Sequence, residues 1–215
     1  MPGCGFVDCS TVDVASARAV AAQAVSAGML PVDAPVSGGV GGAEGGTLTF
    51  MAGGSVDAFM LAEPLFAVMG QKAVHCGQSG AGQAAKICNN MILGATMIVT
   101  CEAFALADGL GLDRQKMFDV VSTSSGYSWT MNAYCPAAGV GPASPADNDY
   151  TPGFAADLML KDLRLAQQAA VEAGADTPLG AAAAALYALF VEDEDGSGKD
   201  FSAMLQRFEK RRRSP

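Results

Sequence analysis

Hydrophobic and polar positions divide the chain into two parts with different patterns. Up to about residue 80, short β-like runs alternate with Ala-rich stretches that have helical spacing. The β-like runs are GFVDCS, MLPVDA, TLTFMAGG and KAVHCG, and the helical stretches are residues 13–27 and 55–69. Strands that alternate with helices predict an α/β segment over residues 1–80. The glycine-rich residues 38–46 are expected to form a loop or turn.

After residue 80 the β-like runs end and the pattern becomes helical. Residues 82–109 predict one long helix, and the Pro- and Gly-rich residues 135–153 predict a long loop. Further helices are predicted at 113–122 with Asp113 as cap, at 154–173, at 178–191 with Thr177 as cap and Pro178 in the first turn, and at 199–212. The expected fold is therefore mainly α, with an all-α domain over residues 81–215 built around the long helix.

Composition narrows the classes of function. The net charge of −9 argues against nucleic acid or an anionic membrane as partner, because both require a basic surface. The apolar run MILGATMIVTC is too short to span a bilayer and predicts a buried helix. With a single histidine, His75, a histidine-built metal site or a Ser-His-Asp triad is not expected. Six scattered cysteines and no signal-peptide pattern suggest reduced thiols in an intracellular protein.

One lysine stands out at the start of the long helix, in the stretch GQSGAGQAAKICNN. Lys86 and Asn90 are four residues apart and share a helix face. Burial and the positive end of the helix dipole would both disfavour the charged ammonium, which makes a buried Lys86 a usable general base. The alternative is that Lys86 extends to solvent and Asn90 caps a neighbouring turn.

Three further stretches carry candidate chemistry. DAPVSGG runs from a strand into Ser37 and two glycines, a turn that can bind an anion but is more often purely structural. DCSTVD ends a strand where α/β sheets bind ligands, although Ser10 or Thr11 could simply cap a helix. FAADLMLKDL places Phe154 and Lys161 on a helix, and most lysines in such positions are surface charges.

Taken together, these four stretches resemble the motifs of the β-hydroxyacid dehydrogenase family, in the same order and over nearly the whole chain. SSGYSW and NDYTPGF resemble one branch of it, which acts in valine catabolism. The resemblance implies an NAD-dependent enzyme that oxidises a small hydroxyacid. It implies that Lys86 is the catalytic lysine, that Asn90 and Phe154 bind substrate, and that Thr11 and Lys161 contact NAD. The carboxylate of the substrate would lie on the turn formed by Ser37, Gly38 and Gly39.

The chain departs from the family pattern at its beginning. Family members carry G-x-G-x-x-G between the first strand and helix of a doubly wound nucleotide-binding domain, and this sequence has no such motif. We therefore expect residues 1–80 to be part of that domain, and we expect this chain by itself to bind NAD weakly or not at all. Another hydroxyacid dehydrogenase or semialdehyde reductase, or a non-catalytic protein that only associates through its long helix, remain the alternatives. A homo-oligomer is expected, in the mitochondrial matrix of a eukaryote or the cytoplasm of a bacterium.

Overall fold

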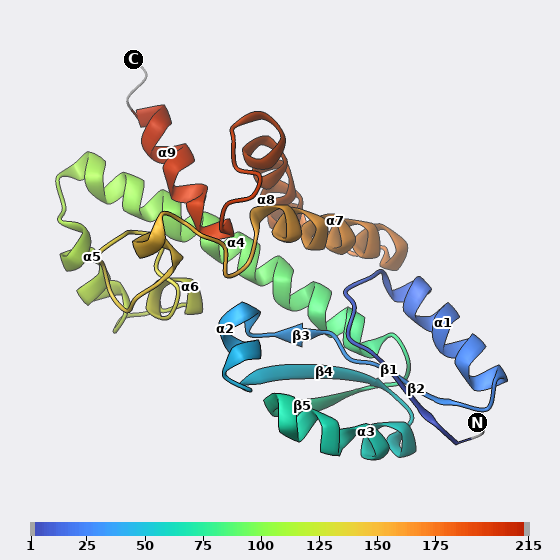
Figure 1. Cartoon of the computed structure of the whole chain (residues 1–215). Helices are drawn as coiled ribbons and strands as arrows, with labels where there is room; N and C mark the ends of the chain where they lie inside the picture. Colours follow the sequence, from blue (N-terminus) through green and yellow to red (C-terminus); the bar gives the residue numbers. More distant parts are fainter. Residues whose placement is uncertain (1–2, 213–215) are drawn as a thin grey trace. The chain divides into compact units, whose positions relative to one another are not determined.

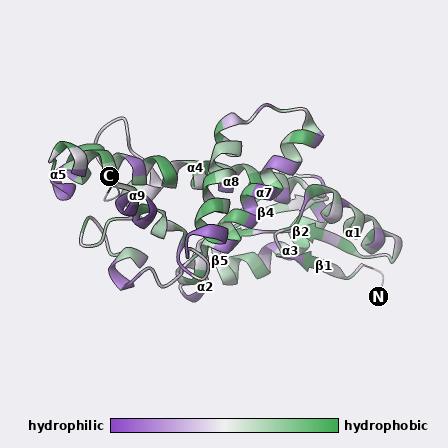
Figure 2. Ribbon diagram, turned by 90° about the horizontal axis from the view of Figure 1, so that it is seen from above, coloured by the Kyte–Doolittle hydropathy of each residue, from purple (hydrophilic) through white to green (hydrophobic). Residues whose placement is uncertain are grey.

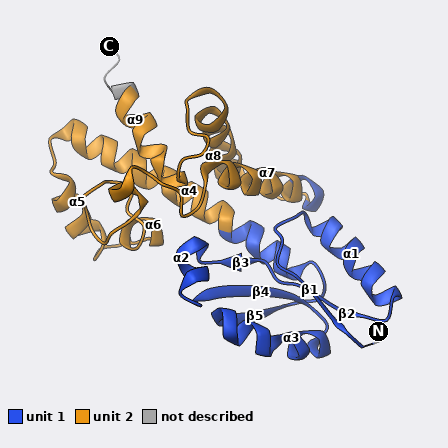
Figure 3. Cartoon of the chain, in the orientation of Figure 1, with its two compact units in different colours: residues 1–89, 171–173 blue, residues 90–170, 174–215 orange. Residues whose placement is uncertain are grey.

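The structure, a computed structural model, describes residues 3–212 and divides into two compact units (Figure 3). The first unit comprises the residues up to Asn89 together with Val171–Ala173, and the second comprises Asn90–Ala170 and the residues from Gly174 onward. The division falls inside a helix, a little beyond the domain boundary predicted at residue 80.

The first unit is the expected α/β segment, with helices between the strands (Figure 1). Its elements are β1 (Gly5–Asp8), α1 (Val14–Ser26), β2 (Leu30–Asp33), β3 (Val36–Ser37), α2 (Gly39–Glu44), β4 (Leu48–Gly54), α3 (Val56–Met69), β5 (Gly70–Gly77) and the start of α4 (Ala81–Leu110). The two-residue strand β3 is too short to leave a recognisable pattern in the sequence.

The sheet of the first unit is mixed. β1 pairs with β2 in parallel, and β4 pairs with β5 in parallel. β4 is antiparallel to both β2 and β3. Its core contains Phe50 of β4 stacked on Phe66 of α3, with ring centroids 4.6 Å apart. Because β1 and β2 are parallel, the segments that follow both strands leave the sheet at the same edge.

One local prediction for the first unit is wrong, and one alternative that the sequence left open is excluded. Residues 38–46 are not simply loop, because Gly39–Glu44 form α2. Because glycine has no side chain, this short helix can lie close to β4: a Cβ at Gly42 would lie 3.3 Å from Leu48 Cδ2. The cap of α1 is neither Ser10 nor Thr11 but Asp13, whose carboxylate accepts hydrogen bonds from the backbone and the hydroxyl of Ser16.

The second unit is helical, as predicted. Besides the larger part of α4, its elements are α5 (Arg114–Val121), α6 (Trp129–Asn132), the 3-10 turn η1 (Pro145–Asn148), α7 (Ala156–Ala173), α8 (Pro178–Ala188), the π-helical turn η2 (Leu189–Asp193), the 3-10 turn η3 (Phe201–Ala203) and α9 (Met204–Arg212). Asp113 caps α5 as predicted. Thr177 is the N-cap residue of α8 as predicted, but its side chain makes no capping hydrogen bond, because its hydroxyl contacts Gln167 Oε1 instead. The predicted loop 135–153 contains η1.

The core of the second unit forms around α4. Met97, Cys101 and Phe104 of α4 are fully buried in it. A glycine brings α4 close to α7, since a Cβ at Gly94 would lie 3.0 Å from Leu163 Cδ2. The predicted long helix is thus the central element of this unit, which explains its apolar sequence.

By length and composition alone, α4 would also pass as a membrane-crossing helix. Figure 2 shows its ribbon as largely hydrophobic. One such helix is weak evidence for a membrane span. Its most apolar window is 44% buried inside the protein, and Met97, Ile98 and Cys101 lie in the core, so the buried-helix prediction is confirmed for one face of the helix.

Candidate active site

The beginning of α4 is held by a buried carboxylate. Asp33, at the end of β2, accepts hydrogen bonds from the backbone N–H of Gly80 at 2.6 Å and of Gln83 at 3.1 Å. A Cβ at Gly82 would lie 2.5 Å from the Asp33 carbonyl oxygen, and one at Gly53 would lie 2.6 Å from Asp33 Oδ1. The glycines of GQSGAG therefore let the end of β2 and the start of α4 approach closely.

This attachment leaves Lys86 buried. Lys86 is only 7% exposed, and its Nζ donates a hydrogen bond of 2.8 Å to the carbonyl oxygen of Val36. The alternative that Lys86 extends to solvent is wrong. Val36 immediately precedes Ser37, so the amine of Lys86 lies at the turn predicted to bind the carboxylate of the substrate.

The predicted substrate turn has the backbone conformation that its glycines suggest. Gly38 has φ 138° and Gly39 has φ 61°, both in the region that disfavours side chains. A Cβ at Gly38 would also lie 3.0 Å from Leu48 Cδ2. Ser37 is paired with Thr49 in the sheet. The first unit therefore brings Lys86, Ser37 and the two glycines together.

In the second unit, Asn90 belongs to a buried polar cluster. Asn90 is 1% exposed and Asp162 is 3% exposed. Nδ2 of Asn90 donates a hydrogen bond of 2.5 Å to Oδ2 of Asp162. The other oxygen of Asp162 lies 3.2 Å from Nζ of Lys161. The predicted substrate residue Asn90 and the predicted cofactor residue Lys161 thus share one carboxylate.

Lys161 is the more exposed member of this cluster. Its side chain is 44% exposed and lines a hollow of about 410 Å³ together with Arg164 of the same helix. Arg164 is paired with Glu192 at 2.6 Å. An exposed cation beside an open hollow can contact an anionic or hydroxylated ligand, and its role toward NAD stays a prediction.

Phe154 lies elsewhere in the second unit, in an aromatic cluster. Its ring meets that of Phe201 edge to face, with centroids 5.7 Å apart, and Tyr134 connects Phe201 to Trp129 by ring contacts. The buried carboxylate of Asp200 accepts hydrogen bonds from Tyr134 Oη at 2.8 Å and from Phe154 N at 3.0 Å. Burial and the charge of Asp200 raise the pKa of Tyr134, so this phenol stays protonated and donates to the carboxylate.

Thr11 lies in the loop after β1, as predicted, and is partly buried. The loop is attached to α4 through Gln83, whose side chain is bonded to Ser10 and Val12. The residues that hold the candidate site, Asp33, Gln83, Asp162 and Asp200, were not singled out from the sequence. Three of them could have been found as polar residues inside the recognised motifs, because Asp33 begins DAPVSGG, Gln83 lies in GQSGAGQAAKICNN and Asp162 follows Lys161.

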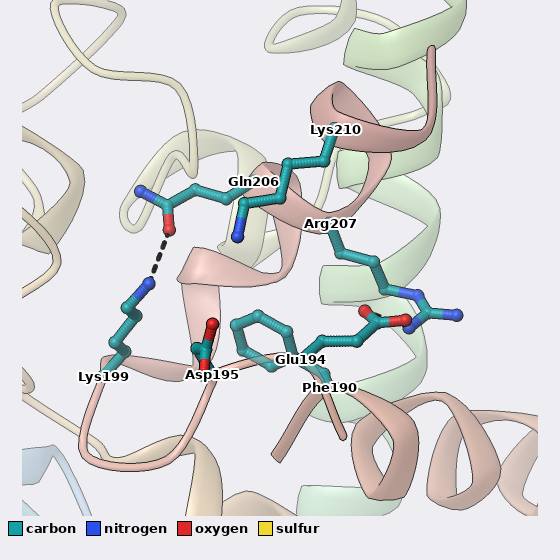
Figure 4. Close-up of a pocket in the computed structure, with 7 residues that line it drawn as sticks. All are labelled: Phe190, Glu194, Asp195, Lys199, Gln206, Arg207 and Lys210. Atoms are coloured by element: carbon teal, nitrogen blue, oxygen red, sulfur yellow. Dashed lines mark hydrogen bonds and ion pairs between the residues drawn. The ribbon is translucent and has the colours of Figure 1, made fainter. Parts of the chain in front are cut away.

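A separate cavity of about 260 Å³ occurs near the end of the chain and is shown in Figure 4. It is lined by Phe190, Glu194, Asp195, Lys199, Gln206, Arg207 and Lys210. Arg207 is ion-paired with Glu194, and Lys199 donates to Gln206 Oε1 at 3.1 Å. None of the residues predicted from the sequence lines this cavity. Within residues 3–212, no three His, Cys, Asp or Glu side chains form a group that could hold a metal ion.

Comparison with known proteins identifies the family. Residues 80–208 match the family model described as the NAD-binding domain of NADP-dependent 3-hydroxyisobutyrate dehydrogenase, and residues 1–77 match the NAD-binding domain of 6-phosphogluconate dehydrogenase. A probable 3-hydroxyisobutyrate dehydrogenase of Mycobacterium tuberculosis is 49% identical over 95% of this chain and 69% of its own length. The chain belongs to the 3-hydroxyisobutyrate dehydrogenase family.

Other members of the family show a similar extent of likeness. An NAD-dependent L-serine dehydrogenase of Pseudomonas aeruginosa is 44% identical over 97% of this chain and 70% of its own length. The solved structure of Mycobacterium tuberculosis 3-hydroxyisobutyrate dehydrogenase with L-serine has a TM-score of 0.91 and 48% identity, covering 96% of this chain and 70% of that one. The β-hydroxyacid dehydrogenase resemblance drawn from the motifs is thereby confirmed.

Proposed function

We propose that this chain oxidises 3-hydroxyisobutyrate to methylmalonate semialdehyde with NAD, the reaction that the valine-degrading members of its family perform. The observation that carries the proposal is the position of Lys86. Its amine is buried and bonded to the carbonyl of Val36, directly before the Ser37–Gly39 turn. An amine held at the carboxylate-binding turn is positioned to act on a hydroxyl group a short distance along the same substrate.

Lys86 acts as the base that removes the proton of the substrate hydroxyl. A neutral amine has two N–H groups and one lone pair. The hydrogen bond to the carbonyl oxygen of Val36 fixes the position of the nitrogen. As a base, the neutral amine offers its lone pair to the hydroxyl proton. When bound, NAD supplies the acceptor for the hydride that leaves the carbon atom bearing this hydroxyl group. The hydroxyl oxygen then becomes the carbonyl oxygen of the product, and the proton remains on Lys86.

Other side chains orient the reactants. Ser37, Gly38 and Gly39 hold the carboxylate of the substrate, and Asn90 and Phe154 contact the rest of it. The edge of the sheet where β1 and β2 end, with Thr11 beside it, fits the nicotinamide end of the cofactor, because α/β sheets bind nucleotides at this edge. Lys161, an exposed cation tied to Asp162, suits a contact with the same nucleotide.

The identity of the hydroxyacid needs its own test, because relatives act on different substrates. One is named for 3-hydroxyisobutyrate and another for L-serine, and both are similar to this chain over most of its length. We expect the larger kcat/KM for 3-hydroxyisobutyrate, measured as NADH formation against L-serine and an unbranched C3 hydroxyacid. A larger kcat/KM for L-serine would assign the chain to the serine branch, and no turnover of any hydroxyacid would favour a non-catalytic protein. The proposed compartment is the mitochondrial matrix in a eukaryote or the cytoplasm in a bacterium.

The proposed homo-oligomer would form through α4. Ile92, Val99 and Leu106 are 62%, 57% and 63% exposed and recur every seven residues, which is the spacing of a seam between paired helices. A second copy of the chain offers the same seam and is the occupant we propose. We expect light scattering to show a dimer or larger oligomer that Val99→Lys converts to monomers. A monomeric wild-type protein would contradict the proposal, and binding to lipid vesicles would assign the seam to a membrane instead.

A further inference from the structure

Gln83 is a buried polar residue that the proposed reaction does not use. Its residue is 0% exposed, and it lies three positions before Lys86 in α4. Both ends of its side-chain amide are bonded to the backbone of the loop after β1. Nε2 donates to the carbonyl oxygen of Ser10 at 2.7 Å, and Oε1 accepts from the N–H of Val12 at 3.2 Å.

These two bonds lie on either side of Thr11. The amide of Gln83 therefore pairs with the two peptide groups that flank this one residue, although they are 73 and 71 positions away in the sequence. The ends of the loop are held separately, by Asp8, which accepts from Ser10 N at 2.9 Å, and by Asp13, which caps α1. Gln83 therefore fixes the middle of the loop.

A buried amide is costly unless its donor and acceptor are both bonded, so an apolar residue would suit this helix position equally well if packing were the only requirement. Glutamine instead supplies one donor and one acceptor at the spacing that the loop presents. The same helix carries Lys86 one turn further along. A single element therefore fixes both the amine and the loop that contains Thr11.

We propose that Gln83 is a positioning residue for the nicotinamide nucleotide. It acts through Thr11, by holding the Ser10–Val12 backbone in register with Lys86. The inference rests on the proposed function, in which Thr11 contacts the cofactor. It predicts that cofactor affinity depends on a side chain that does not itself touch the cofactor.

Two variants of Gln83 separate the two bonds. Gln83→Met keeps the length and flexibility of the side chain and removes both bonds. Gln83→Glu keeps an oxygen that can accept a hydrogen bond from Val12 N–H. Its second carboxylate oxygen would face the carbonyl oxygen of Ser10, so the hydrogen bond to Ser10 is lost. The matched control is Gln23→Met, which changes an exposed glutamine of α1 in the same unit.

The first readout needs no cofactor. Hydrogen exchange of the Val12 amide is expected to accelerate about tenfold in Gln83→Met, as for the loss of one ordinary hydrogen bond, and to change less in Gln83→Glu. The second readout is the dissociation constant for NAD by calorimetry, with KM for NAD as its kinetic counterpart. Both are expected to rise about tenfold in either variant, with kcat changed less, while Gln23→Met behaves as wild type.

The decisive comparison uses a Thr11→Val background. If Gln83 acts through Thr11, Gln83→Met adds little to the loss of NAD affinity that Thr11→Val already causes. Full additivity, unchanged exchange of the Val12 amide, or unchanged NAD affinity in an active enzyme would each overturn the role of Gln83. A wild-type protein that neither binds NAD nor oxidises a hydroxyacid would reject the proposed function itself, and the role of Gln83 with it.

Discussion

Replacing Asp33 by alanine should destabilise the first unit more than replacing any exposed carboxylate in it. Asp33 is 7% exposed and accepts two backbone hydrogen bonds, from Gly80 at 2.6 Å and from Gln83 at 3.1 Å. A hydrogen bond to a charged group is worth about 1.5–3 kcal/mol. Losing both leaves two buried N–H groups unpaired, so we expect a loss of about 3–5 kcal/mol in the free energy of unfolding.

The assay is urea unfolding followed by circular dichroism. Asp13→Ala is the matched control, because Asp13 also accepts a backbone hydrogen bond at a helix start but is solvated, so its loss is expected to cost less. Asp33→Asn keeps one good acceptor oxygen and should cost about half as much as the alanine change. If Asp33→Ala costs no more than Asp13→Ala, the carboxylate does not hold the start of α4.

The same residue gives a pH dependence with a definite sign. Burial raises the pKa of the Asp33 carboxyl above its usual value, and the backbone donors of Gly80 and Gln83 offset this only in part. Because the folded-state pKa is the higher one, the stabilising contribution is complete below the unfolded pKa and is lost as pH rises through the folded pKa. From about pH 3.9 upward, wild type should therefore lose stability relative to Asp33→Asn. If the difference in the free energy of unfolding between wild type and Asp33→Asn does not change with pH above this value, the burial argument is contradicted.

Three further changes probe the rest of the site. Asn90→Ala should lower kcat less than a change of Lys86 does, because it removes an orienting amide and not the base, and equal losses in steady-state kinetics would contradict this. Gly82→Ala should destabilise by about 1–3 kcal/mol or more in urea unfolding, because its Cβ would lie 2.5 Å from the Asp33 carbonyl oxygen, and wild-type stability would refute the close approach. Asp200→Ala should raise KM for the hydroxyacid by releasing Tyr134 and the backbone of Phe154, and an unchanged KM would separate this cluster from the substrate.

The sequence predicted the elements whose patterns are local. The helix around Lys86, the alternation before residue 80 and the cap at Asp113 all follow from periodicity and capping chemistry. α2 was missed because glycine composition indicates a turn, whereas close packing against Leu48 decides in favour of a short helix. β3 and α6 are too short to carry a periodic signal.

The residues of the candidate site also divide into those with a local signal in the sequence and those without one. Lys86, Ser37 and Asn90 could be named from motif chemistry and helical spacing. The bonds that support them could not be predicted, because these bonds span 47 to 73 residues of sequence. Asp33 accepts from the backbone at the start of α4, the side chain of Gln83 bonds the loop after β1, and Asp162 accepts from Asn90. A carboxylate or amide becomes a supporting residue only when the fold makes it buried and gives it a distant donor or acceptor, and neither property is visible in one sequence.

The catalytic role of Lys86 is tested most directly by steady-state NADH formation from 3-hydroxyisobutyrate by wild type and Lys86→Arg over a pH series. Arginine keeps the positive charge but is protonated at any working pH, so it cannot accept the hydroxyl proton. The proposed mechanism predicts a loss of at least about 10²–10⁴-fold in kcat with NAD affinity largely unchanged. Near-normal turnover by Lys86→Arg would show that the buried lysine is structural and would contradict the assignment of Lys86 as the base.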